Sequence, residues 1–143
     1  MIISDSLKIL QDAHLAFENR EYSKAVIEIN ISVELAIKEF FHRKNKKSKL
    51  FHQYTDKLQK LEIIDKFTNV CIINNLCNPD ELKQCVALIK KRNRIIHDGE
   101  IFNVEECKKE FYTLAKVVSK LMEYEKVFTP AFPNFNVFGR LTN

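Results

Sequence analysis

The sequence predicts an all-α fold, an up-and-down bundle of about five helices, and three observations indicate it. The 2 glycines and 3 prolines make up 5 of the 143 residues, whereas average usage of about 12 per cent would give roughly 17. So few turn-forming residues exclude a β-sandwich, barrel or propeller, each of which needs many tight turns. Apolar residues recur at helical spacing, and two segments carry helix-start signals. We expect one domain over residues 1–126 and an extended tail over 127–143.

The first helix is expected over residues 4–18, because its apolar residues recur at the 3.6-residue period of a helix. One face of this helix carries Leu7, Leu10, His14 and Phe17. Asn19 follows directly, and asparagine tolerates the left-handed conformation that often ends a helix. We therefore expect the helix to stop at Asn19.

Residues 21–43 are expected to form a second helix, although part of this segment alternates like a β-strand. Polar residues separate a series of apolar ones at a period of two: Ile27, Ile29, Ile31, Val33, Leu35 and Ile37. We favour a helix because neither flank carries a turn signal and no second strand is evident to pair with this one. A helix that is apolar on most sides also suits the middle of a bundle.

A basic segment follows, with five positive charges and no negative charge: Arg43, Lys44, Lys46, Lys47 and Lys49. We expect this segment to be a loop or a frayed helix end. A third helix is expected from about Asp56, with Leu58, Leu61 and Ile64 in phase. Residues 67–76 are compatible with its continuation, and the pattern does not define where it ends.

The clearest helix start lies at Asn78. This residue can cap a helix, Pro79 suits the first helical position, and Glu81 lies at the third, as in a capping box. The fourth helix then carries an in-phase series of Leu82, Val86, Ile89, Asn93 and Ile96. Gly99 is expected to end it in the left-handed conformation.

A second capping box, from Asn103 to Glu106, is expected to open the fifth helix. Its apolar residues repeat at the heptad spacing of a helix packed in a bundle: Val104, Cys107, Phe111, Leu114, Val118 and Leu121. The tail over 127–143 is rich in phenylalanine. We expect it to be extended and to pack on its own domain or on a partner.

The composition excludes several common classes of site. The net charge is +4, and the two glycines, Gly99 and Gly139, cannot make a Gly-rich phosphate loop. Gly-x-Ser-x-Gly, His-Glu-x-x-His and EF-hand patterns are absent. The cysteines lack C-x-x-C spacing, which favours buried thiols in a reducing cytosol over a zinc site: Cys71, Cys77, Cys85 and Cys107. We expect a cytoplasmic protein, because neither a signal peptide nor a membrane-length apolar stretch is evident.

Chemistry-bearing side chains gather in the stretch over residues 90–99. Asn93 and Arg94 share a helix face with His97, because they precede it by four and three residues. Arg92 precedes His97 by five residues, which is about 140° around a helix. Arg92 and His97 therefore diverge within one straight helix, unless the helix end distorts or a two-fold axis brings Arg92 of one chain to His97 of another.

This set of side chains suits the cleavage of RNA. Arginine binds a phosphate through two hydrogen bonds, and histidine exchanges a proton near neutral pH. RNA supplies its own nucleophile, the 2′-hydroxyl, so such a site needs no metal, whereas DNA hydrolysis commonly recruits metal ions. The alternative interpretation is a solvated basic helix end that complements the helix dipole.

Arg92, Asn93 and His97 resemble the signature of the HEPN superfamily, an arginine followed by four to six residues and a histidine, with a polar residue after the arginine. Residues 15–25, a short turn leading into a long apolar helix, are similar to the early helix pair of that superfamily. The resemblance covers about residues 5–125. It implies an all-α bundle that commonly dimerises, and a metal-independent ribonuclease of the kind found in toxin–antitoxin and other defence systems.

The resemblance also implies roles for individual residues. Arg92 would bind and polarise the scissile phosphate, and Asn93 would position it. His97 would exchange a proton with the 2′-hydroxyl or the leaving 5′-oxygen, and a 2′,3′-cyclic phosphate would result. Gly99 departs from the tyrosine that often lies two residues after the histidine in members silenced by a nucleotidyltransferase. Further contacts to RNA are expected from basic residues: Arg43, Lys44, Lys46, Lys47, Lys49, Lys91 and Arg94.

The expected partners are RNA, a second copy of the chain, and an antitoxin or larger defence-system component, with no cofactor and no metal. An alternative function is a non-catalytic helical module that binds a protein or a nucleotide, as in some members of the superfamily. A third is nucleic-acid binding without cleavage through residues 43–49, which would weaken as salt is added.

Overall fold

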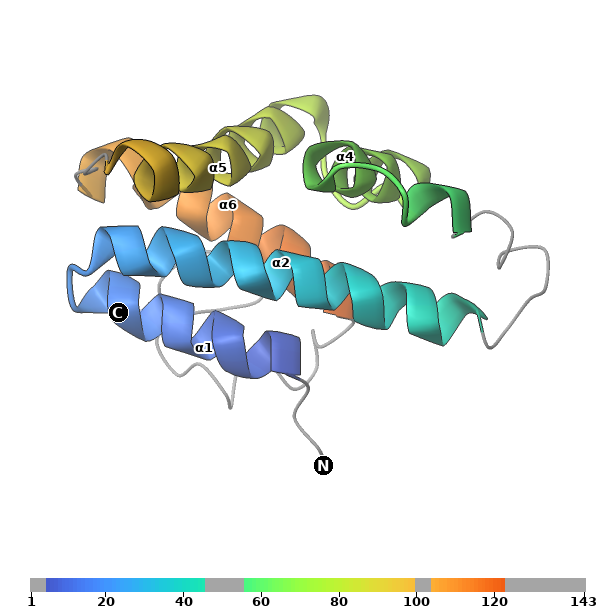
Figure 1. The fold of residues 1–143 in the computed structure, drawn as a ribbon, viewed down its shortest axis with the longest axis horizontal. Coiled ribbons are helices and arrows are strands. Elements are labelled where there is room, and N and C mark those ends of the chain that lie inside the picture. The colour runs from blue at the N-terminus through green and yellow to red at the C-terminus, as the bar shows by residue number, and fades with distance from the viewer. Residues whose placement is uncertain (1–4, 46–55, 100–103, 123–143) are drawn as a thin grey trace.

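The computed structural model describes residues 5–45, 56–99 and 104–122, and its regular structure there is entirely helical (Figure 1). The helices are α1 (Asp5–Glu18), α2 (Tyr22–Asn45), α4 (Ile63–Ile73), α5 (Pro79–Asp98) and α6 (Val104–Met122). The predicted all-α bundle is therefore confirmed. The tail over 127–143 lies outside the described residues.

The turn between α1 and α2 differs from the prediction by one residue. The left-handed residue is Arg20, with a φ of 63°, and not Asn19. The reason is the hydrogen-bond pattern, in which the Glu21 N–H donates to the Ala16 carbonyl and the Arg20 N–H to the Phe17 carbonyl. This is a Schellman motif, and it places the left-handed residue at Arg20. The predicted face of α1 is buried.

Helix α2 is the centre of the bundle and contacts each of the other four labelled helices. The prediction of a helix in place of a strand is thus confirmed. The apolar residues alternate along the sequence because several sides of this central helix are buried. Two polar side chains that interrupt the apolar series are also buried, and both are satisfied. The Asn30 amide donates to the Val26 carbonyl at 2.7 Å, and the Ser32 hydroxyl donates to the Ser6 carbonyl at 2.8 Å.

The prediction of a helix that runs from about Asp56 through Ile64 is wrong. Residues 56–58 are helical, a turn occupies the next residues, and α4 begins at Ile63. Leu58 and Phe67 are both buried, but they are nine residues apart, which is about 180° around a helix. A single straight helix would point them in opposite directions, whereas the turn lets both face the core. Helix α4 ends at Ile73, which defines the boundary that the pattern left open.

Local signals define α5 as predicted. Asn78 and Glu81 form a complete capping box, and Gly99 follows the helix with a φ of 66°. Of the in-phase series on this helix, however, Ile89 alone is buried, while Asn93 and Ile96 are exposed. The buried side of α5 is rotated from the predicted face and carries Cys85, Leu88, Ile89 and Lys91.

Helix α6 completes the core with the predicted heptad. Cys107, Phe111, Leu114, Val118 and Leu121 are each at most 1 % exposed. The Phe111 ring stacks on Phe17 of α1 with centroids 4.4 Å apart. The second capping box and the Val104 side chain lie outside the described residues and side chains.

Candidate functional site

The C-terminal half of α5 carries the predicted catalytic residues. Helix α5 packs against α2 and α6, and it stays α-helical through Asp98. Asn93, Arg94 and His97 are on the solvent side of the helix, whereas Arg92 is half-buried. The predicted site is thus open to solvent on one side and joined to the bundle on the other.

Arg92 faces α2 and lies near Glu34. Its Nη1 is 3.7 Å from Glu34 Oε1, and the two side chains are 30 % and 45 % exposed. This separation is longer than a charge-assisted hydrogen bond of about 2.7–2.9 Å. The buried Nε of Arg92 finds no hydrogen-bond partner among the described residues. The guanidinium therefore has donors beyond those that Glu34 can satisfy.

The structure does not bring Arg92 and His97 together within one chain. Because α5 continues without distortion to Asp98, the two residues remain about 140° apart around it. His97 lies in the last turn of the helix and is exposed. Arg92 and His97 could meet through distortion of the helix end or through pairing of two chains. Because the end of α5 is not distorted, only pairing of two chains is compatible with a shared site.

Lys91, a predicted RNA contact, is engaged in an ion pair. Its Nζ donates to Glu110 Oε2 of α6 at 2.7 Å, and the Lys91 side chain is 11 % exposed. A phosphate would have to compete with Glu110 for this ammonium group. Arg94 is exposed and, with Lys83 and Lys90, lines a shallow groove between α5 and Thr68 of α4.

The basic segment is described in part. Arg43 donates to the Leu121 carbonyl at 2.7 Å and its guanidinium lies 6.0 Å from the centre of the Phe40 ring. The Lys44 ammonium lies 5.4 Å from the same ring. These two residues close the end of α2 against the core. Lys46, Lys47 and Lys49 lie outside the described residues.

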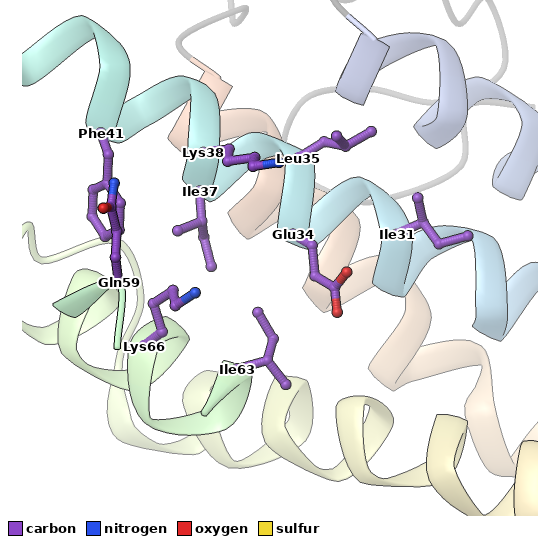
Figure 2. Close-up of a pocket in the computed structure, with 9 residues that line it drawn as sticks. All are labelled: Ile31, Glu34, Leu35, Ile37, Lys38, Phe41, Gln59, Ile63 and Lys66. Carbon is purple, nitrogen blue, oxygen red and sulfur yellow. The ribbon is translucent and has the colours of Figure 1, made fainter. Parts of the chain in front are cut away.

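A hollow of about 520 Å³ lies between α2 and α4, and sequence reasoning missed it. Figure 2 shows Glu34 and Ile37 of α2 facing Ile63 and Lys66 of α4 across this space. Gln59, in the turn before α4, also lines it. Nothing in the local pattern signals this hollow, because its two walls are formed by helices about thirty residues apart, and their meeting depends on tertiary packing.

Burial favours the neutral form of three of the four thiols. Burial raises the pKa of Cys71 and of Cys85 far above the ordinary value of a thiol, and it also raises that of Cys77. The neutral thiol is a weak nucleophile. Within the described ranges no group of three or more His, Cys, Asp or Glu side chains is arranged to hold a metal ion. No helix of these ranges combines the length and apolarity that a membrane span requires.

Comparisons of the chain with family models, with curated proteins and with solved structures gave no match.

Proposed function

We propose that this protein is a metal-independent endoribonuclease whose active site combines Arg92, Asn93 and His97 across a homodimer. Arg92 binds the scissile phosphate, Asn93 positions it, and His97 exchanges a proton with the 2′-hydroxyl or the leaving 5′-oxygen. The observation that carries the proposal is the state of Arg92. Its side chain is 30 % exposed and its acidic partner Glu34 lies 3.7 Å away, so a phosphate can approach the exposed part of the guanidinium and compete with that carboxylate.

A second copy of the chain is part of the proposal because one chain holds Arg92 and His97 apart. The outer side of α5 favours such pairing. Ile96 beside His97 is 51 % exposed, and Val86, in a groove between α5 and α4, is partly exposed. An exposed apolar side chain such as Ile96 is suited to cover by a partner. A two-fold axis near α5 would place Arg92 of each chain beside His97 of the other.

The biological role that we propose is that of a toxin or defence effector, restrained by an antitoxin or another protein of the same system. The support is the resemblance of Arg92, Asn93 and His97 to the HEPN signature. The proposal of cleavage stands separately from this role, because it depends on side chains that one experiment can test.

The test is cleavage of RNA in excess EDTA by the full chain and by Arg92→Ala and His97→Ala variants. We expect each variant to be slower by about 10²–10⁴-fold, the usual contribution of a catalytic proton-transfer group or phosphate ligand. Lys8→Ala is the matched control, since it removes one exposed positive charge from α1 and should leave the rate unchanged. Equal rates for all four proteins would contradict the proposal.

Mixing the two inactive variants tests the dimer. If each site takes Arg92 from one chain and His97 from the other, a mixed dimer contains one intact site, and random mixing restores about a quarter of the wild-type activity. A site contained in one chain would give no recovery. Failure of both experiments would leave the alternative function, a non-catalytic helical module.

A further inference from the structure

The hollow between α2 and α4 has the size of a site for a small molecule. Its volume of about 520 Å³ lies within the range of about 300–1,000 Å³ that is typical of ligand pockets. Helices α2 and α4 contact each other at few positions, and the space between them therefore stays open. Ile37 and Phe41 are both 2 % exposed and form an apolar floor.

The polar groups around this floor are few and differ in chemistry. Glu34 contributes a carboxylate and Gln59 an amide, while Lys38 and Lys66 contribute ammonium groups. Two lysines and one glutamate favour a ligand that carries negative charge. The combination of an apolar floor, an amide and a carboxylate suits a flat ring with hydrogen-bonding groups on its edge. Nucleobases have this character, and proteins recognise them in single-stranded RNA when they are turned out of the stack.

The position of Glu34 connects the hollow to the proposed active site. This residue lines the hollow and its Oε1 lies 3.7 Å from Nη1 of Arg92. A base that bonds to Glu34 therefore has its sugar and phosphate in the neighbourhood of Arg92. A second hollow shares Lys38 and Gln59 with the first and is also lined by Glu39, His42 and Arg43.

We propose that the hollow between α2 and α4 binds one base of the RNA substrate, next to the phosphate held by Arg92, and that Glu34 makes it prefer guanine. The proposal rests on the proposed ribonuclease function. A carboxylate is purely an acceptor, and the Watson–Crick edge of guanine presents two adjacent donors, N1–H and N2–H₂. Uracil presents one donor between two carbonyl oxygens, which the carboxylate would repel. The Gln59 amide can donate to the guanine O6.

The first test measures binding of nucleoside monophosphates to the His97→Ala protein, so that no cleavage interferes. Titration by calorimetry, with amide NMR shifts to locate the site, should show GMP at α2 and α4, bound about 5- to 150-fold more tightly than UMP, as expected for one two-bond base contact. Glu34→Gln should reduce this ratio towards one, because an amide both donates and accepts. The ratio of the GMP affinity to the UMP affinity reports on the base contact alone. Glu34→Gln also removes the charge near Arg92, but this change affects the phosphates of both nucleotides equally.

A filling substitution tests the location. Ile63→Trp should block the hollow and abolish binding of GMP, whereas Ile72→Trp should not, because Ile72 lies on the same helix but is 64 % exposed and does not line the hollow. Gln59→Ala, in the exposed turn, provides a second variant if Ile63→Trp fails to fold, and it should weaken GMP binding. Equal affinities for GMP and UMP, equal effects of the two tryptophan variants, or binding of apolar peptides in place of nucleotides would overturn the proposal.

Failure of the base site and failure of the ribonuclease function give different results. Loss of cleavage in Arg92→Ala together with equal binding of all four nucleotides keeps the function and removes the base site. GMP binding at the hollow without any RNA cleavage keeps the site and removes the function. If both stand, sequencing of the cleavage products should show guanine enriched next to the cut, and Glu34→Gln should remove the enrichment.

Discussion

Helices α1, α2 and α6 differ from α4 and α5 in how completely they are packed. Each helix of the first group contributes a large buried side chain to the core. Phe17 of α1, Phe41 of α2 and Phe111 of α6 are at most 5 % exposed. In the second group Ile72, Ile73 and Ile96 are each more than half exposed, whereas among the described residues of the first group Leu15 is the one large apolar side chain of this kind. The hollow also lies along α4. The residues proposed to bind or cleave RNA, from Glu34 to His97, lie at or beyond the border between the groups. The proposed RNA chemistry and the most tightly packed part of the core thus involve different surfaces of the bundle.

The largest expected effect is on the packed group. Phe111→Ala removes a fully buried ring that stacks on Phe17, and it should lower the free energy of unfolding by about 3–5 kcal/mol. Ile72→Ala on α4 is the control and should change it by less than about 0.5 kcal/mol, as is usual at exposed positions. Denaturant unfolding followed by circular dichroism measures both. Similar losses for the two variants would show that the side of α4 that carries Ile72 is packed as tightly as the core around Phe111.

A smaller effect is expected at the ion pair that joins α5 to α6. Glu110→Ala leaves the mostly buried Lys91 ammonium without its acceptor at 2.7 Å and should cost about 1–3 kcal/mol. The double change Lys91→Met with Glu110→Leu should recover most of this loss, because apolar pairs often replace buried ion pairs without cost. The exposed pair of Glu21 and Lys24 is the control, and Glu21→Ala should cost less than about 0.5 kcal/mol. A cost for Glu110→Ala as small as this control would mean that the pair does not hold α5 in place.

The smallest of the three effects concerns the start of α5. The Asn78 side chain accepts from the Glu81 N–H at 2.8 Å, and the Asn78 N–H donates to Glu81 Oε1 at 3.0 Å. Asn78→Ala should lower the free energy of unfolding by about 1 kcal/mol, while Asn78→Ser, which can still cap, should lower it by less. If hydrogen exchange at the start of α5 is equally fast in both variants, the cap does not stabilise this helix locally.

The parts of the fold that could be predicted are those with local causes. The limits of α5 follow from a cap, a proline and a glycine at the ends of the helix itself, and the burial of α6 follows from its own heptad. The turn before α4 was missed because Leu58, Leu61 and Ile64 are in phase locally, and the need to bury both Leu58 and Phe67 arises only in the folded bundle. The rotation of α5 was missed for a similar reason, since α2 and α6 select which of its two apolar sides is covered.

The candidate site divides in the same way. Spacing along one helix is enough to single out Arg92, Asn93 and His97, and the 3.6-residue period alone predicts that Arg92 and His97 diverge. The partners of the basic residues could not be predicted, because Glu110 meets Lys91 and Glu34 meets Arg92 across helix interfaces. The chemistry of each side chain and the start and end of its helix were thus determined by the sequence itself, through bonds between near neighbours. Tertiary packing decided three features: which cations are paired, which face of α5 is open, and where a hollow remains. Each of these features depends on how separate helices meet.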